Sequence, residues 1–175
     1  HDGARPWRGM KRDNWEGGHR VPMVARWPGR IKAGTKTGQT TCLTDLMATC
    51  AAITGARLPN DAAEDSFNIL PVLLGEAKNP VRDFTLHQTM SLALAIRKGD
   101  WKYLDHKGSG GNNYARNKNL KALVLPEKAP DAPGQLYNLA DDPREEKNLY
   151  QEKPEVVARL KKLLNKYRKE GRSAP

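Results

Sequence analysis

The segment Gly9–Pro22 reads Gly-Met-Lys-Arg-Asp-Asn-Trp-Glu-Gly-Gly-His-Arg-Val-Pro, and Lys11 stands four residues ahead of its tryptophan. The paired glycines predict a tight turn, because glycine accepts a positive φ or a close backbone approach that other residues resist. The run Val21–Trp27 predicts a short strand, which Pro22 confines to a sheet edge or to the first residues of the strand. The segment is therefore expected to pass from loop to tight turn to strand.

The chain has the size and composition of an ordinary folded domain. Its 175 residues suit one domain, or one lobe with an appendage. Apolar residues make up 38% and charged residues 29%, which predicts a soluble globular protein rather than a disordered one. No apolar run approaches the roughly 18–20 residues of a membrane helix, so no membrane contact is expected. Residues 1–6 lack an initiator methionine and an apolar signal core, so we expect a cut within a longer polypeptide.

The net charge of +10 raises the question of a polyanionic partner. The basic residues are scattered, with local concentrations at 116–121 and 161–169, and aromatic residues amount to only 6%. Nucleic-acid platforms interleave basic and aromatic side chains, so no nucleic acid is expected. A solvated cationic surface is the favoured interpretation, and a general attraction to polyanions such as sulfated glycans stays open.

An apolar stripe predicts a helix in the first half of the chain, ending at Gly55. Its members recur at helical spacing: Leu43, Leu46, Met47, Cys50 and Ala51. On such a helix Cys42 and Cys50 lie about 10–12 Å apart, beyond the roughly 4.4–6.8 Å that a disulfide spans, so both are expected to be free and buried. Residues 69–74 form a short apolar element whose type the pattern leaves open.

The second half of the chain changes to shorter elements. Residues 92–104 predict a β-hairpin with its turn at Lys98-Gly99-Asp100, and residues 135–139 predict another strand. The stretches 105–119 and 126–134 are expected to be exposed loops. A helix is predicted from Pro154, which suits a first helical position, to the stop at Gly171.

Little in the sequence carries chemistry by itself. It contains no Cys-x-Pro-x-Arg or Ser-x-Pro-x-Arg run and no Gly-x-Ser-x-Gly or P-loop motif. The four histidines are too dispersed for an ordinary metal site, so no metal ligand is assigned: His1, His19, His87 and His106. Taken by itself, Lys11 is one of 30 basic residues and predicts a solvated surface side chain. The residues alone indicate a soluble α+β chain with one suggestive lysine.

An ordered series of motifs resembles the type I sulfatases (arylsulfatases) of the alkaline-phosphatase-like superfamily. The matching stretches run through nearly the whole chain: residues 8–11, 15–18, 20–22, 27–31, 44–46, 71–75, 95–103, 136–139, 142–143 and 148–149. Met10 departs from the family, which usually has glycine there. The resemblance implies an α+β fold: the C-terminal part of an α/β sulfatase, with a small antiparallel sheet packed by a long C-terminal helix. It also implies a division into residues 1–80, the end of the catalytic domain, and 81–175, a C-terminal subdomain.

The same resemblance implies the catalytic equipment of the parent enzyme. Sulfatases use a formylglycine nucleophile and a calcium ion (Ca²⁺), and both would come from a missing N-terminal domain. The metal ligands end in an Asp-Asn pair that precedes the lysine, whereas Asp13 and Asn14 follow Lys11, so we interpret them as part of the loop. We therefore expect this chain alone to bind no cofactor and to be inactive.

Two site residues are carried over by the resemblance. Lys11 matches the lysine that contacts a sulfate oxygen, so it is the catalytic and substrate-binding candidate. His87 falls where some members bring a polar side chain to the substrate pocket, and its alternative is an ordinary exposed imidazole. His19 is expected to pack, and Glu16 and Arg20 are expected to pair across the turn as structural support.

The function expected from the resemblance is the hydrolysis of sulfate esters by a full-length parent. The alternative is a non-catalytic basic module that binds polyanions, sulfated glycan or nucleic acid, which only the net charge favours. Members of the family are commonly exported, so a periplasmic or extracellular location is expected. The expected partners are a sulfate-ester substrate and the N-terminal sulfatase domain.

Overall fold

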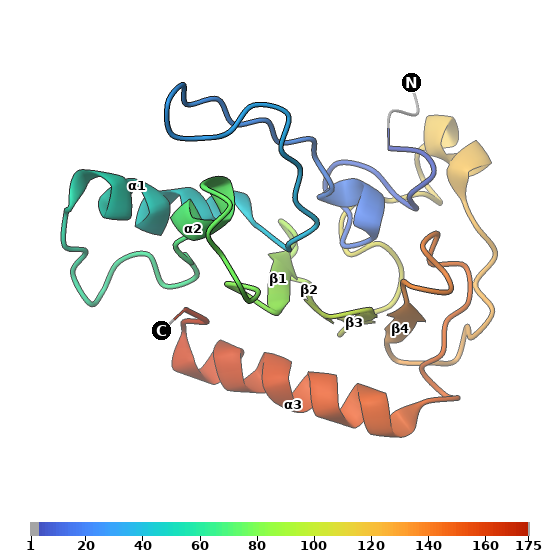
Figure 1. Cartoon of the computed structure of the whole chain (residues 1–175). Coiled ribbons are helices and arrows are strands. Elements are labelled where there is room, and N and C mark those ends of the chain that lie inside the picture. The colour runs from blue at the N-terminus through green and yellow to red at the C-terminus, as the bar shows by residue number, and fades with distance from the viewer. Residues whose placement is uncertain (1–3, 175) are drawn as a thin grey trace. The chain divides into compact units, whose positions relative to one another are not determined.

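The computed structural model describes residues 4–174, and Figure 1 labels its helices and strands. The strands are β1 (Phe84–Gln88), β2 (Leu94–Lys98), β3 (Trp101–Leu104) and β4 (Gln135–Asn138). The α-helices are α1 (Leu46–Thr54), α2 (Leu70–Leu73) and α3 (Pro154–Glu170). Three short 3-10 helices complete the set: η1 (Glu16–Gly18), η2 (Leu43–Asp45) and η3 (Lys118–Leu123). Among residues 4–174, no helix has both the length and the apolar character needed to cross a bilayer.

The chain divides into two compact units. Within the described residues, unit 1 consists of residues 4–21 and 86–164, and unit 2 of residues 22–85 and 165–174. The division at residue 80 that the sequence suggested stays a prediction.

A small antiparallel sheet in the order β1-β2-β3-β4 organises unit 1. Lys102 lies between Arg97 of β2 and Tyr137 of β4, and Tyr103 lies between Ile96 and Leu136. Because side chains alternate along a strand, these two rows point to opposite faces of the sheet. The predicted hairpin and the predicted strand at 135–139 are confirmed.

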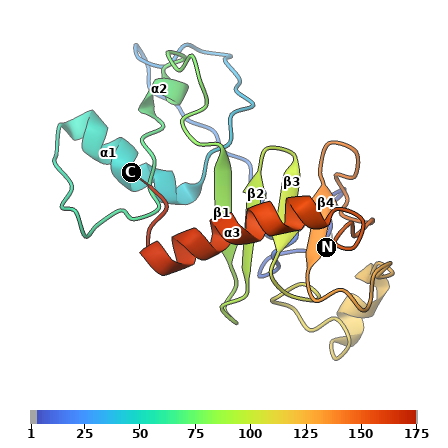
Figure 2. The ribbon, with the colours of Figure 1, turned by 90° about the horizontal axis from the view of Figure 1, so that it is seen from below.

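Each face of this sheet is covered by a different part of unit 1. Residues 154–164 of α3 run across one face, where Figures 1 and 2 agree. The helix buries Val156, Val157, Leu160 and Leu164. On the other face Trp15 joins an apolar cluster with Ala95, Leu104, Tyr137 and Leu139. The N-terminal loop is thus held on the sheet by its tryptophan.

Unit 2 is organised around one buried carboxylate, that of Asp45. It accepts hydrogen bonds from the backbone N–H groups of Cys42 at 2.7 Å and Phe67 at 3.0 Å. The guanidinium of Arg82 pairs with it at 3.0 Å. Asp45 therefore ties the start of the helical region to two later segments of the unit.

The helix predicted from residue 43 to Gly55 is confirmed as η2 followed by α1, with Gly55 at a φ of 71°. Two other expectations for this region are wrong. Residues 21–27 form no strand, since no described segment pairs with their backbone. Cys42 and Cys50 are both free, but neither is buried: Cys42 is half-buried and Cys50 is exposed.

Candidate functional site

Lys11 occupies the tip of a tight turn whose backbone is held from both sides. The Asp13 N–H donates to the Met10 carbonyl at 3.0 Å, and the Asn112 side chain donates to the Lys11 carbonyl at 2.9 Å. Arg12 takes a φ of 91°, which turns the chain back sharply. The Lys11 side chain itself is exposed. The structure thus combines a fixed backbone with a solvent-facing ammonium.

Asp13 fixes this turn with both oxygens of its buried carboxylate. Oδ2 accepts from the Met10 N–H at 3.0 Å and from the Tyr114 hydroxyl at 2.5 Å. Oδ1 accepts from the backbone and side-chain nitrogens of Asn112, at 3.0 and 2.9 Å. Four donors occupy the carboxylate, so it serves the architecture of the loop. Within residues 4–174, no group of three His, Cys, Asp or Glu side chains has a metal-binding arrangement.

The two glycines of the turn are required by close backbone contacts. A Cβ on Gly17 would lie 2.4 Å from the Gly9 carbonyl oxygen, and one on Gly18 would lie 1.9 Å from the Asp13 carbonyl oxygen. Both distances are below any allowed contact, so the chain can fold back on itself here only with glycine. The turn then places Trp15 on the sheet, where its indole N–H donates to Gln135 Oε1 at 3.0 Å.

Glu16 is the centre of a buried ionic network. Its carboxylate is fully buried and pairs with Lys102 Nζ at 2.9 Å, Arg97 at 3.0 Å and Arg20 Nε at 2.5 Å. Burial by itself would raise the pKa of Glu16, but the Lys102 charge and the hydrogen bonds of Lys102 and Arg20 hold that pKa well below its usual range. The Glu16–Arg20 pair predicted from the sequence is confirmed.

Lys102 is a completely buried lysine that reaches this network from β3. Besides Glu16, its ammonium lies 2.9 Å from His19 Nε2 and 3.3 Å from Glu145 Oε1. Burial raises the pKa of Glu145, and the nearby ammonium acts against that rise. Glu145 also accepts the Glu16 backbone N–H at 2.6 Å. Loop, strand and the segment after β4 are joined through these charged groups.

The rings of His19 and His87 stack at a centroid distance of 3.7 Å and an interplanar angle of 15°. Both rings line a cavity of about 350 Å³ in unit 1, together with Arg12, Asp13 and Asn14 from the lysine loop. Burial and the Lys102 charge lower the pKa of His19 to about 3. Burial and its charged neighbours likewise hold the pKa of His87 well below its ordinary value. The cavity wall therefore presents two neutral imidazoles at neutral pH.

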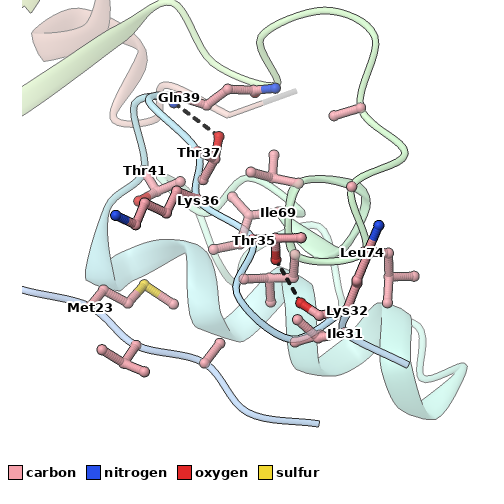
Figure 3. Close-up of a pocket in the computed structure, with 16 residues that line it drawn as sticks. Met23, Ile31, Lys32, Thr35, Lys36, Thr37, Gln39, Thr41, Ile69 and Leu74 are labelled. Carbon is pink, nitrogen blue, oxygen red and sulfur yellow. Dashed lines mark hydrogen bonds between the residues drawn. The ribbon is translucent and has the colours of Figure 1, made fainter. Parts of the chain in front are cut away.

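A larger hollow of about 810 Å³ lies in unit 2 and has a different character. Apolar side chains such as Met23, Ile69 and Leu74 gather around it with Lys36 and Thr41 (Figure 3). None of the network residues described above lines it. The hollow is therefore distinct from the cavity beside the lysine loop.

The structure places one of the two predicted site residues in the wall of the cavity, and the other next to a wall residue in the chain. His87 lines the cavity, whereas Lys11 is not among its lining residues but directly precedes Arg12, which is. Their roles in substrate binding stay predictions. Sequence reasoning missed Lys102 and Glu145, because a lysine in an alternating strand and a glutamate after a turn both resemble solvated side chains.

Curated relatives of the chain are sulfatases. It is 34% identical over 158 residues to an N-acetylgalactosamine-6-O-sulfatase of Bacteroides thetaiotaomicron, covering 90% of this chain and 29% of that protein. It is 33% identical over 162 residues to human arylsulfatase A, covering 87% of this chain and 31% of that protein. The chain thus spans less than a third of the length of these curated relatives. No family model matches it.

Solved sulfatase structures match the fold over most of the chain. One comes from a Bacteroides thetaiotaomicron locus for glycosaminoglycan metabolism, with a TM-score of 0.74 and 34% identity over 91% of this chain and 31% of that one. Another is a sulfatase from Pseudoalteromonas sp., with a TM-score of 0.71 and 26% identity over 93% of this chain and 32% of that one. Sequence and structure agree over the same extent. The chain belongs to the type I sulfatase family, and it corresponds to the C-terminal portion of that fold.

Proposed function

We propose that this chain acts as the C-terminal part of a sulfuric ester hydrolase, in which Lys11 binds the sulfate group. The observation that carries the proposal is the Lys11 turn, with its backbone hydrogen-bonded on both sides and its side chain exposed. A fixed backbone limits the positions that the ammonium can reach. Relatives whose names state sulfatase activity support the reaction class.

Lys11 would stabilise the negative charge that collects on the sulfate oxygens during cleavage. An ammonium on a flexible stem is a compact point charge that can follow an anion as its geometry changes. Stabilisation of developing charge is commonly the largest single contribution to such a reaction. The Asp13 carboxylate, two residues further along the chain, already accepts four hydrogen bonds from other groups. We therefore do not assign it as the partner of the Lys11 ammonium.

His87 would contact the non-reacting part of the ester from the cavity wall. Its low pKa keeps the imidazole neutral, so it would act as a hydrogen-bonding group rather than as a cation. The relatives carry different ester names, from N-acetylgalactosamine-6-O-sulfatase to steryl-sulfatase. What these names share is the sulfate ester, and we propose it as the substrate class.

The nucleophile and the metal of a sulfatase would come from the rest of a full-length enzyme. The sequence holds no Cys/Ser-x-Pro-x-Arg motif from which formylglycine is made. The described carboxylates near Lys11 do not fit a calcium site, because Asp13 is fully hydrogen-bonded and Glu16 is surrounded by cations. We accordingly propose that this chain by itself does not turn over a sulfate ester.

We further propose that the rest of the sulfatase covers an apolar surface on unit 2. On α1, which is apolar around its circumference, Leu46 and Met47 are 42% and 51% exposed. Val24 in the unpaired segment is 93% exposed. A helix apolar on all sides normally lies inside a protein, and an unpaired extended segment offers its backbone to another strand. The solved relatives, of which this chain covers about a third, have the additional length to supply that cover.

The direct test replaces Lys11 in a full-length parent enzyme. Lys11→Ala should lower kcat/KM for an aryl sulfate by about 100-fold or more, the scale of a lost transition-state contact. Lys121→Ala, which removes an exposed lysine of η3, is the matched control and should leave kcat/KM unchanged. An unchanged kcat/KM in Lys11→Ala would remove the catalytic role.

A polyanion-binding module remains the competing proposal, and net charge is the observation in its favour. It would show as tight binding of heparin or DNA that weakens steeply between two salt concentrations. The sulfatase proposal expects weak binding of both. We also propose an extracytoplasmic location, periplasmic or extracellular, on the strength of the family resemblance alone.

A further inference from the structure

Three acceptor atoms surround the ammonium of Lys102, two at hydrogen-bond distance and one as an ion-pair partner. Nζ lies 2.9 Å from Glu16 Oε1, 2.9 Å from His19 Nε2 and 3.3 Å from Glu145 Oε1, and the side chain is completely buried. An ammonium has three donors and no acceptor. Since Lys102 can only donate, the His19 Nε2 atom that faces it must accept.

This contact determines which nitrogen of His19 carries its proton. A neutral imidazole has one donor and one acceptor nitrogen, so an accepting Nε2 leaves the proton on Nδ1. A rotation of the ring would break the 2.9 Å contact of Nε2 with Lys102, so the same contact also holds the plane of the His19 ring.

His19 in turn provides a flat support for His87. The two rings are nearly parallel at 3.7 Å, so a rotation of the His19 ring would remove the contact surface of His87. The charged groups that face the two rings come from the turn and from the sheet: Glu16, Arg20, Arg97 and Lys102. Three of these four are cations, which opposes protonation of either imidazole.

We propose that Lys102 is a positioning residue of the substrate cavity: it fixes the tautomer and plane of His19, and the His19 ring holds His87 in place. The part of this inference that concerns substrate rests on the proposed role of His87. The part that concerns tautomer and ring order depends only on the buried network. In a working sulfatase, the arrangement would keep substrate binding by His87 insensitive to pH between 5 and 8.

The test is a two-dimensional ¹⁵N–¹H NMR titration of the histidine side chains in this chain. His19 should show the Nδ1–H tautomer and no protonation between pH 5 and 8. In Lys102→Met, the His19 signals should shift to mixed tautomers, and its titration should move upward into a measurable range. Lys102→Arg keeps a buried cationic donor and should restore the Nδ1–H tautomer. Lys98→Met, an exposed lysine of the same hairpin, should leave the spectrum unchanged.

The outcomes separate this inference from the proposed function. An Nε2–H tautomer, or a His19 midpoint near 6.5 in the unmodified chain, would overturn the positioning role even if Lys102→Met fails to fold. In the full-length parent, Lys102→Arg should keep the pH profile of KM flat, whereas Lys102→Met should introduce a slope. A flat profile in a folded Lys102→Met would also overturn the inference. The Lys11→Ala measurement tests the proposed function independently of these signals.

Discussion

The two units differ in how much charge they bury and in where their apolar side chains are exposed. Unit 1 buries charged groups and gives each one partners, as Glu16 with its three cations shows. Unit 2 leaves large apolar side chains such as Val24 and Met47 in solvent. Buried charges cost several kcal/mol unless they are paired, whereas exposed apolar area indicates a surface that expects a partner. Unit 2 buries one ion pair, Asp45 with Arg82, and several of its exposed apolar side chains lie on η2 and α1, whereas those of unit 1, such as Met90 and Leu92, lie in loops.

The largest effect is expected from removing the centre of the network in unit 1. Glu16→Ala leaves Lys102, Arg97 and Arg20 without their shared carboxylate, so the free energy of unfolding should fall by about 3–5 kcal/mol. Urea denaturation followed by circular dichroism measures this. Glu146→Ala removes an exposed partner of Arg144 and should cost less than about 1 kcal/mol. Equal losses in the two variants would contradict the importance of the buried network.

Unit 1 should lose stability on acidification at pH values well above the pKa of an ordinary carboxylate. His19 has a folded pKa of about 3 against an ordinary 6.5, so the unfolded chain binds a proton that the folded chain refuses. Stability should fall as the pH drops below 6.5, by about 2 kcal/mol for His19 between pH 7 and pH 5. His87 acts in the same direction, and Glu16 adds its loss below 4.5. Glu145, whose pKa is raised, acts oppositely above 4.5.

Thermal unfolding measured from pH 8 to pH 5 tests this expectation. His19→Gln should flatten the dependence, since the side chain can still accept from Lys102 but no longer titrates. A melting temperature that is constant from pH 8 to pH 5 would show that the two imidazoles are not held neutral.

A moderate effect is expected at the glycine turn. Gly18→Ala brings a Cβ to 1.9 Å from the Asp13 carbonyl oxygen, so the backbone must move, at a cost of about 1–3 kcal/mol. Gly38→Ala has open space around its Cβ and should be neutral within about 0.5 kcal/mol, or slightly stabilising. Differential scanning calorimetry of the two variants compares them directly. A harmless Gly18→Ala would mean that the turn is not as closely packed as described.

The smallest effect in this chain is expected on the apolar surface of unit 2. Met47→Lys changes a side chain that is 51% exposed, so the free energy of unfolding should stay within about 0.5 kcal/mol. The same change in a full-length parent should destabilise it by more than 1 kcal/mol, because it places a charge in the proposed interface. Unfolding of both proteins with and without the change gives the comparison. An equally small change in the parent would show that this surface remains open there.

Local patterns predicted most of the longer regular elements and one ion pair, but not strand β1. The helix before Gly55, the hairpin around Gly99 and the helix from Pro154 were all predicted, because capping, turn and periodicity signals lie within each element. The pairing of Glu16 with Arg20 is likewise a contact between residues four apart. The strand expected at 21–27 was wrong, since a strand exists only when another segment pairs with it.

The functional side chains also fall into two groups, those identified from the sequence and those identified only from the tertiary structure. The sequence by itself determined the family, and with it the interest of Lys11 and His87, because motif order survives in the linear chain. Only the tertiary structure decided that Lys102 of β3 meets Glu16, His19 and Glu145 in one buried network, and that His19 lies flat on His87. Contacts between residues more than 40 positions apart depend on which faces of loop and sheet come together, and no local pattern encodes that choice.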